Sequence, residues 1–582
     1  MASLISKASL LMVPSTYEPG TLFNVLPSGN RAPDSTDQNS GYDQTRADFD
    51  FDRGSNAAAT RIGSDGLLKK YRENVLTESN NFSDSDWTKS NVTLTSSQAD
   101  KDGGTDAWKI EKDANSYRSI FQSLSISGVY TFSVYAKAGT LSELTLRDGS
   151  TQRSRFNLSS GTIIENVGSV TSKMTDVGGG WYRCEAVLTT STPNFQIYPD
   201  WNQSDAGFIY IQDAQTETGL CSTEYLNSTD VTGKAGVLVD LPRINYDANG
   251  ENGALLLEPS RKNVVTNSEY VSSSDYVVGN WTGTITTNTT ETLSPEGVYN
   301  ATKFVKAGAS DRVYFHNSQP DGAYTGSIYL KAASGSENKT IEISVRRFGG
   351  GGGATTKLVT ITSEWQRFDV TATNLTGGTT TAMYISDFSS AGTATEFYSY
   401  AMQIEAASYS SSYIPNHGTS GGVTRAADVC NNGGSAESIN STEGVLYAEI
   451  AALVNGGENR VMSISDGSYQ NSVRIQFYTN TNEIEMRIVT GNSPQALERV
   501  AITNTLNFNK IAVKYKANDF QLWVNGSKLR FDTSGTMPAA NTFDTFNFDD
   551  GDGNGVFYGN VKQVAVFNEA LTDSELATLT TL

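Results

Sequence analysis

One nine-residue pattern that occurs twice constrains the fold of this chain more than any other feature of its sequence. Residues 130–138 (YTFSVYAKA) alternate large side chains with small or polar ones, and this period of two is typical of a half-buried β-strand. The pattern returns at residues 324–332 (YTGSIYLKA), 194 positions after residue 130. The fold must therefore accommodate two copies of the same strand.

Four further landmarks repeat in the same order, at offsets of 184 to 189 residues. Such constant offsets indicate two copies of one β domain that differ by loop insertions. Short strands, Gly and Asn turns and the lack of long helical periodicity predict a jelly-roll β-sandwich for each copy. The repeated pairs are Asn74 and Asn263, Trp181 and Trp365, Gln215 and Gln403, and Tyr225 and Tyr413.

A chain of 582 residues predicts several domains. We expect an all-β protein with an extended N-terminal arm, tandem β-sandwich (jelly-roll) domains and a different C-terminal sandwich. One helix is expected near the C-terminus, where Thr572 or Asp573 can cap residues 574–578. The predicted divisions are an arm (1–45), a short β connector (46–73), the first jelly roll (74–228), a second connector (229–262), the second jelly roll (263–428) and the C-terminal domain (429–582).

Charge and composition exclude several classes of protein. The formal net charge of −20 disfavours binding to nucleic acid or to an anionic membrane surface. No apolar run reaches the length of a membrane span, so we expect no membrane insertion. Three cysteines in 582 residues make no disulfide framework. These features favour a protein that leaves the producing cell by a route other than the common secretory one.

Several motifs resemble modules of bacteriophage virion proteins. The C-terminal motifs resemble the concanavalin A-like, laminin-G-type lectin fold, and the upstream ones resemble the carbohydrate-binding-like jelly rolls of the same proteins. The C-terminal motifs are residues 444–449, 463–467, 514–526 and 570–576. The upstream motifs are residues 49–53, 59–61, 65–67, 74–79, 412–415 and 424–428, together with Trp87.

The resemblance implies a tail fibre, spike or head appendage that binds host cell-surface glycans during adsorption. Its arm would dock on other virion proteins, the protein would be a homotrimer, and it would reside in the virion after assembly in the host cytoplasm. One alternative is a capsid or tail decoration protein that binds no sugar. A second alternative is a polysaccharide depolymerase.

Tryptophan rings are the natural stacking platforms for sugar rings, because their flat apolar faces match the C–H faces of a pyranose. Four tryptophans are candidates for carbohydrate binding, namely Trp87, Trp201, Trp281 and Trp523. Trp181 and Trp365 recur in both repeats and are interpreted as core residues.

The segment 549–554 packs four oxygen-bearing side chains between glycines, as a Ca²⁺ loop can. The candidate ligands are Asp549, Asp550, Asp552 and Asn554, and Ca²⁺ is the only cofactor considered. The alternative is a plain acidic turn, because the distal glutamate of an EF-hand is missing.

Catalytic residues are not predicted, and the protein is expected not to be an enzyme. Glu483 and Glu485 share one face of a predicted strand, as the paired carboxylates of a glycosidase do. They lack the flanking Asp and aromatic residues, so a solvated strand edge is the preferred interpretation. His316 and His417 are the only histidines, and His417 is interpreted as a loop residue.

Overall fold

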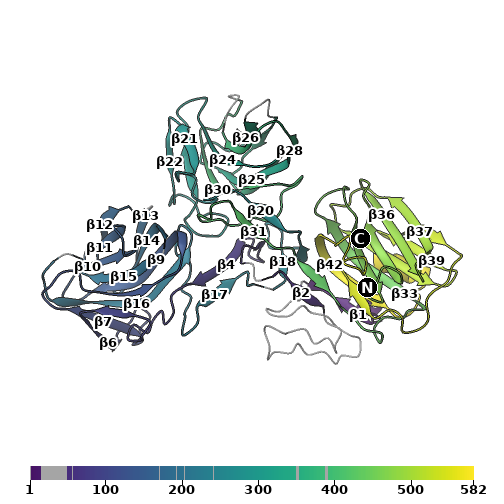
Figure 1. Ribbon diagram of the computed structural model, residues 1–582, viewed down its shortest axis with the longest axis horizontal. Helices are drawn as coiled ribbons and strands as arrows, with labels where there is room; N and C mark the ends of the chain where they lie inside the picture. Colours follow the sequence, from purple (N-terminus) through teal and green to yellow (C-terminus); the bar gives the residue numbers. More distant parts are fainter. Residues whose placement is uncertain are drawn as a thin grey trace. The chain divides into compact units, whose positions relative to one another are not determined.

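The computed structural model describes residues 2–14, 49–54, 57–168, 171–191, 193–201, 203–239, 241–348, 353–386 and 391–582. Strands make up 50% of the structure and helix 2%, which confirms the predicted all-β class. Among the described helices, none is long and apolar enough to cross a membrane. The chain forms two compact units (Figure 1). Unit 1 comprises residues 1–69, 239–261 and 425–582, and unit 2 comprises residues 70–238 and 262–424.

Unit 2 contains two β-sandwiches, and the first is built from two six-stranded antiparallel sheets. Its central strand is the repeated pattern, whose Phe132, Val134 and Ala136 are fully buried. One sheet has the order β13 (Thr171–Gly178), β14 (Trp181–Ser191), β9 (Ser127–Ala138), β16 (Gly207–Thr218), β7 (Ala107–Lys112) and β6 (Val92–Gln98). The other has the order β12 (Thr162–Val167), β11 (Arg153–Asn157), β10 (Glu143–Arg147), β15 (Asn194–Pro199), β8 (Ser119–Ser123) and β5 (Thr88–Ser90).

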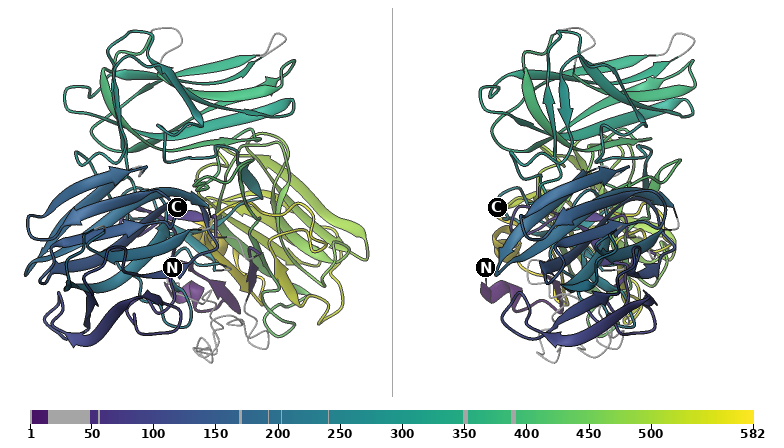
Figure 2. Two further views of the ribbon diagram at one scale, coloured as in Figure 1. Left: turned by 60° about the vertical axis from the view of Figure 1, so that its left-hand side comes forward. Right: turned by 90° about the vertical axis from the view of Figure 1, so that its left-hand side faces the viewer.

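The second sandwich has two five-stranded sheets, which Figure 2 shows in teal as two layers; their strand order is that of the first sandwich without counterparts of the edge strands β12 and β13. The repeat in the sequence is therefore a repeat of topology. One sheet has the order β28 (Gln366–Leu375), β25 (Gly322–Ala332), β30 (Glu396–Glu405), β23 (Thr302–Val305) and β22 (Thr284–Thr286). The other has the order β27 (Ala354–Thr360), β26 (Thr340–Phe348), β29 (Thr380–Ile385), β24 (Arg312–Ser318) and β21 (Tyr276–Asn280).

Two of the repeated landmark pairs make the same hydrogen bonds in both sandwiches. Asn74 and Asn263 are both 0% exposed, and each donates from its side-chain amide to two backbone carbonyls. The hydroxyls of Tyr225 and Tyr413 each meet a serine hydroxyl, at 2.6 and 2.5 Å. A buried amide without such partners would be costly, which explains why the same residue types occupy equivalent positions.

The sandwich of unit 1 draws its strands from distant parts of the chain. Its larger sheet has the order β18 (Arg243–Asn245), β19 (Ala254–Leu257), β42 (Gly559–Phe567), β33 (Glu443–Ala452), β38 (Asn509–Lys516), β39 (Phe520–Val524) and β40 (Ser527–Asp532), with β1 (Leu10–Met12) also paired to β42. Its smaller sheet has the order β37 (Ser493–Ala501), β36 (Glu483–Thr490), β35 (Ser472–Phe477), β34 (Arg460–Ser465) and β41 (Thr545–Asn547). The remaining strands of the chain form separate small sheets outside the sandwiches and are β2 (Asp50–Asp52), β3 (Thr60–Ile62), β4 (Leu68–Asn74), β17 (Gly233–Gly236), β20 (Arg261–Asn263), β31 (Val423–Arg425) and β32 (Val429–Asn431).

Part of the predicted N-terminal arm belongs to this sheet. Leu10 and Met12 are 0% exposed and pair with Val566 and Val564 of β42. Their apolar side chains join the same core as the connector strands β18 and β19. Residues 15–45, where the rest of the arm was predicted, lie outside the described residues. The other domain boundaries stay predictions.

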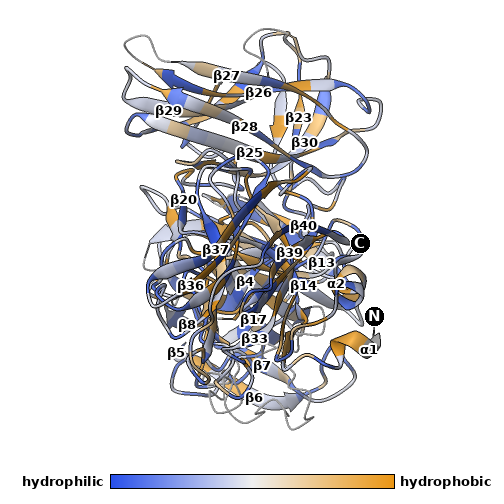
Figure 3. Cartoon of the chain, turned by 90° about the vertical axis from the view of Figure 1, so that its right-hand side faces the viewer, coloured by the Kyte–Doolittle hydropathy of each residue, from blue (hydrophilic) through white to orange (hydrophobic). Residues whose placement is uncertain are grey.

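The described residues of unit 1 also include two helices. The predicted C-terminal helix is α2 (Asp573–Thr580), in which Thr572 is the N-cap and forms a reciprocal capping box with Glu575. The short helix α1 (Ala2–Ile5) is coloured as hydrophobic in Figure 3, and its Leu4 packs in one cluster with Leu576 and Leu579 of α2.

A buried ionic network lies inside unit 1. Asp428 accepts hydrogen bonds from the Nη1 of Arg53 at 3.3 Å and from the Nη2 of Arg243. Glu258 meets the guanidinium groups of Arg243 and Arg425, each at 2.8 Å. The side chains of all five residues are 0–2% exposed. These residues come from all three chain segments of the unit, so the network joins the segments through charge.

Candidate functional site

The outer face of one sheet of the first sandwich concentrates polar and aromatic side chains. Along β10, Leu144 and Leu146 are fully buried in the core. Because successive side chains of a strand point to opposite faces, Glu143, Thr145 and Arg147 lie on the outer face. The same alternation on β11 and β15 brings further polar residues to this face.

Trp201 lies beside this face, directly after β15, and is half-buried. Its ring makes edge-on contacts with Tyr117 and Tyr198, with ring centroids 5.0 and 4.8 Å apart. The guanidinium carbons of Arg147 and Arg153 lie 5.1 and 5.3 Å from the ring centroid. Aromatic and cation–π contacts of this kind hold an indole ring in a fixed orientation. Trp201 is therefore a pre-oriented aromatic platform.

Two arginines of the face are held by carboxylates. Arg155 donates twice to Glu143, at 2.8 Å for both contacts, and once to Glu165 at 3.1 Å. Glu165 also accepts from Arg153 at 3.0 Å. The hydrogen bond to Glu143 raises the pKa of Arg155, and the hydrogen bond from Arg155 lowers the pKa of Glu165. This network fixes the positions of the charged groups before any ligand arrives.

Arg147 has a different environment from the other two arginines. Its Nη1 donates to Gln196 Oε1 and to the Tyr198 hydroxyl, both at 3.3 Å, and its Nη2 donates to the Ser150 carbonyl. Its Nε is buried without a hydrogen-bond partner. Within the described part of the chain, Arg147 forms no ion pair with a carboxylate. Its positive charge therefore remains available to a ligand that approaches Trp201.

Asp200 precedes the tryptophan, and its carboxyl group has a raised pKa. Burial raises its pKa to about 6, with a contribution from the nearby carboxylate of Glu143. The ammonium group of Lys112, 4.0 Å away, opposes this shift. The backbone of Asp200 has a φ of +64°, and the amide of Trp201 donates to Glu143 Oε1 at 3.1 Å. The segment that carries the platform is thus fixed by the same glutamate that holds Arg155.

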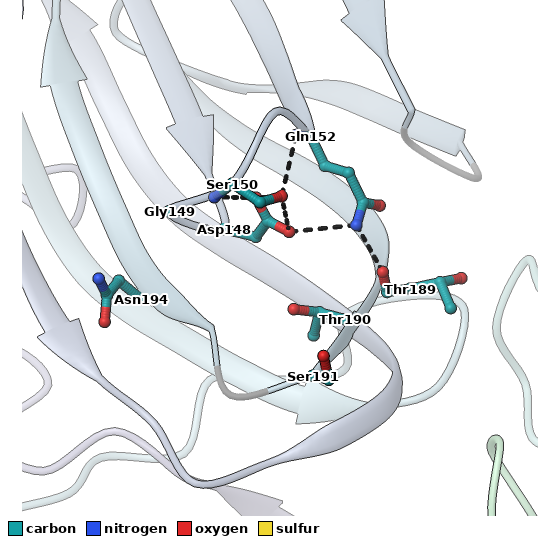
Figure 4. Close-up of a pocket in the computed structure, with 8 residues that line it drawn as sticks. All are labelled: Asp148, Gly149, Ser150, Gln152, Thr189, Thr190, Ser191 and Asn194. Atoms are coloured by element: carbon teal, nitrogen blue, oxygen red, sulfur yellow. Dashed lines mark hydrogen bonds between the residues drawn. The ribbon is translucent and has the colours of Figure 1, made fainter.

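A polar pocket of about 450 Å³ opens next to this face, at the end of the hairpin between β10 and β11 (Figure 4). In its wall the carboxylate of Asp148 accepts from the amide of Ser150 at 2.8 Å, from its hydroxyl at 2.6 Å and from Gln152 Nε2 at 3.1 Å. Because these donors already bind the carboxylate, Asp148 holds the wall of the pocket in place. The lining residues are Asp148, Gly149, Ser150, Gln152, Thr189, Thr190, Ser191 and Asn194.

The four candidate tryptophans have different environments. Trp87 and Trp523 are 1% and 6% exposed, so the prediction that these two rings present a stacking face to a sugar is corrected. Trp281 packs edge-on against Phe304 at 5.1 Å and contributes to the core. Trp201 is the candidate that lies beside a polar, charged face. The structure does not bring the four rings together into one site.

The candidate calcium loop does not have the arrangement of a cation site. Asp549 accepts from the Gly551 amide at 2.7 Å and from Asn431 Nδ2 at 2.9 Å. Asp550 Oδ1 accepts from the amides of Asp552 and Asn554, at 3.0 and 3.1 Å. The described residues include no group of three His, Cys, Asp or Glu side chains that could hold a metal ion. The carboxylates instead stabilise a turn through N–H donors, so the residues do not fit Ca²⁺.

The carboxylates considered for catalysis are engaged elsewhere. Glu485 is 0% exposed and pairs with Arg499 and with Arg487, the latter at 3.4 Å. Glu483 accepts from Asn480 at 2.6 Å. His417 is buried 3.7 Å from a carboxylate oxygen of Glu269, and burial lowers its pKa to about 4. Glu485 is therefore a buried, ion-paired strand residue. The interpretation of Glu483 and Glu485 as a solvated strand edge is wrong for Glu485.

Sequence reasoning identified Trp201 but missed Arg147, Arg153, Arg155 and Tyr198. The signal available in the sequence was the alternation of charged and apolar residues in Glu143–Arg147 and Arg153–Asn157. That alternation indicates an outward face but does not say which strands are neighbours.

No protein-family model matches the chain, and no curated protein matches it. Solved structures with some similarity include the CBM40 domain of the Ruminococcus gnavus IT-sialidase bound to α2,3-sialyllactose. The two sequences are 16% identical, the match covers 24% of this chain and 83% of that chain, and the TM-score is 0.21. The tandem CBM22-1–CBM22-2 domain of Paenibacillus barcinonensis Xyn10C has 13% identity, 58% and 97% coverage, and a TM-score of 0.20. Domains LG4-5 of the mouse laminin α1 chain have 10% identity, 47% and 93% coverage, and a TM-score of 0.17. Scores this low carry no argument about ligand or origin, and the case for function depends on the geometry of the site.

Proposed function

We propose that the first sandwich binds a saccharide on the outer face of the sheet that contains β10, β11 and β15. The observation that carries this proposal is Trp201, a half-buried ring held between two tyrosines and two arginines. A sugar needs an apolar surface for its C–H face and directional partners for its hydroxyls. The indole offers the first, and Arg147 and the neighbouring polar pocket offer the second.

We propose binding without turnover. The carboxylates nearest the platform support this, because Glu143 and Glu165 are held by arginines, and ion pairing makes such groups poor general acids. Asp200, with its pKa of about 6, is 5% exposed and directed towards Lys112. A depolymerase would instead need an accessible acid and an accessible base on opposite sides of one glycosidic bond.

At a finer level, we propose that the protein is a tail fibre, spike or head appendage of a bacteriophage and contacts host surface glycans during adsorption. The resemblance of residues 444–449 and 570–576, and of the upstream motifs, to modules of bacteriophage virion proteins supports this proposal. The proposal includes the homotrimer that the resemblance implies. A trimer would help adsorption, because weak single sites become effective when several bind one surface.

The binding proposal is tested with an array of neutral and acidic oligosaccharides and the purified intact protein. Trp201→Ala is expected to weaken binding roughly 5- to 150-fold, because loss of one stacked aromatic ring removes roughly 1–3 kcal/mol. Trp365→Ala is the matched control, since Trp365 is also partly buried but donates to the Leu293 carbonyl in the second sandwich. Equal binding by wild type and Trp201→Ala, or no binding to any array member, would overturn the proposal.

The virion proposal has a separate test. Antibodies raised against unit 2 are applied to phage particles released from the producing host, and electron microscopy then shows whether and where they bind. Labelling of a tail or head appendage, with reduced adsorption of the labelled particles, is the expected result. Labelling of the capsid lattice with normal adsorption would favour the decoration alternative, and unlabelled particles would exclude a virion role.

A further inference from the structure

The aromatic platform and the polar pocket of the first sandwich are joined by one side chain. The guanidinium carbon of Arg147 lies 5.1 Å from the centroid of the Trp201 ring, and its Nη2 donates to the carbonyl oxygen of Ser150. Ser150 is one of the residues that line the pocket. A sugar stacked on the ring therefore has the pocket as its neighbour, one guanidinium group away. A ligand can occupy both places only if it extends beyond a single sugar ring.

The pocket contains a polar side chain that is positioned but not engaged. Asn194, the first residue of β15, lines the pocket, and its backbone amide donates to the Asp148 carbonyl at 2.9 Å. Gly149 approaches so closely that a Cβ there would lie 3.2 Å from Asn194 Nδ2. Among the described residues, the side-chain amide of Asn194 has no hydrogen-bond partner, and Figure 4 shows it apart from the hydrogen-bonded group of Asp148, Ser150 and Gln152. Its N–H groups and its carbonyl oxygen can therefore both bind sugar hydroxyls.

The charge of the pocket disfavours an acidic sugar unit. The carboxylate of Asp148, which is 4% exposed, lies in its wall, and the eight described residues that line the pocket include no Lys, Arg or His. A sugar carboxylate in the pocket would lie near Asp148 without a cation among the lining residues to compensate, and like charges repel strongly where water is partly excluded. A neutral unit that bears hydroxyls meets no such repulsion, so it is the unit that complements the pocket.

We infer that the site of the first sandwich spans at least two consecutive sugar units, one stacked on Trp201 and the next in the polar pocket. The unit in the pocket is neutral, and the side-chain amide of Asn194 binds its hydroxyls. This inference rests on the proposed function, because the platform holds the first unit. The ligand is then an oligosaccharide chain rather than a single sugar residue, and Asn194 is a residue that determines its specificity.

The test is a ligand-detected NMR titration of the intact protein with glucose, galactose and mannose, with the disaccharides of each, and with the corresponding uronic acids and diuronates. A neutral disaccharide is expected to bind roughly 5- to 150-fold more tightly than its monosaccharide, because the amide of Asn194 can make two hydrogen bonds to the second unit. The diuronates are expected to show no such gain over the uronic acids. Asn194→Ala should remove the gain and leave monosaccharide binding unchanged, whereas Trp201→Ala should weaken both. Asn374→Ala is the matched control, because Asn374 is an exposed strand residue on β28 of the second sandwich.

The outcomes separate this inference from the proposed function. Equal affinity for monosaccharide and disaccharide, weakened in Trp201→Ala and unchanged in Asn194→Ala, would leave the proposed function standing and overturn the two-unit site. Disaccharide binding that is weakened in Asn194→Ala but unchanged in Trp201→Ala would overturn the platform and, with it, the two-unit site. Diuronates that gain as much from the second unit as neutral disaccharides do would overturn the neutral class, and no binding to the panel would overturn both proposals.

Discussion

Asp428→Asn should destabilise unit 1 strongly, and the size of the effect follows from the buried network. The carboxylate lies among three buried arginines and one buried glutamate, so the substitution raises the net charge of the cluster from +1 to +2. It weakens two charge-assisted hydrogen bonds, from Arg53 and Arg243, while Asn Oδ1 can still accept from the Glu258 amide. Removing one partner of a buried ion pair costs about 3–5 kcal/mol.

Hydrogen exchange measured by mass spectrometry tests this value and localises it. A loss of about 3–5 kcal/mol should accelerate exchange of the most protected amides of β33 and β38 roughly 150- to 4,000-fold, whereas amides of β9 and β25 in unit 2 should be unaffected. Glu443→Gln is the control, because Glu443 forms an exposed pair with Lys516 and such pairs contribute about 0–1 kcal/mol. Exchange in Asp428→Asn no faster than in Glu443→Gln would refute the argument that the network stabilises unit 1.

Two predictions concern pH. Burial raises the pKa of Asp200 to about 6, so the folded protein favours the protonated form of this carboxyl group. The stability of unit 2 should therefore fall as pH rises from about 4 through 6. Asp200→Asn, in which asparagine also tolerates the positive φ, should remove this contribution when thermal unfolding is compared at pH 5 and 7. Burial lowers the pKa of His417 to about 4, so its contribution is complete above pH 6.5 and should be lost as pH falls towards 4. His417→Asn should make unfolding of unit 2 less sensitive to pH over that range, and an unchanged pH profile would contradict the prediction.

The two sandwiches of unit 2 were predictable because their strands are long and their periodicity is local. Residues 130–138 and 324–332 lie within β9 and β25, and the landmarks Asn74 and Asn263 are buried hydrogen-bonding residues in both copies. The place of Leu10–Met12 was not predictable, since a three-residue strand has almost no periodic signal. Its partner β42 lies about 550 residues later, and only the assembled sheet shows that the two pair.

The site was predictable only in part, for a similar reason. Trp201 could be named because it lies in a polar segment, but the same reasoning selected Trp87 and Trp523, whose burial is decided by neighbours distant in sequence. The guanidinium groups around Trp201 come from different strands, so finding them requires the order and register of the sheet.

The pairing of β42 with β1, β19 and β33 has a consequence for biosynthesis. A ribosome that adds about 5–20 residues per second needs roughly 30–110 seconds to reach residues 559–567 after it has made residues 10–12. During that interval the apolar side chains of Leu10 and Met12 have no partner strand. The sandwich of unit 1 must therefore close after translation has reached the last strand, when the segments of both jelly rolls have already left the ribosome. Its N-terminal strand is the first part to be made and among the last to become ordered.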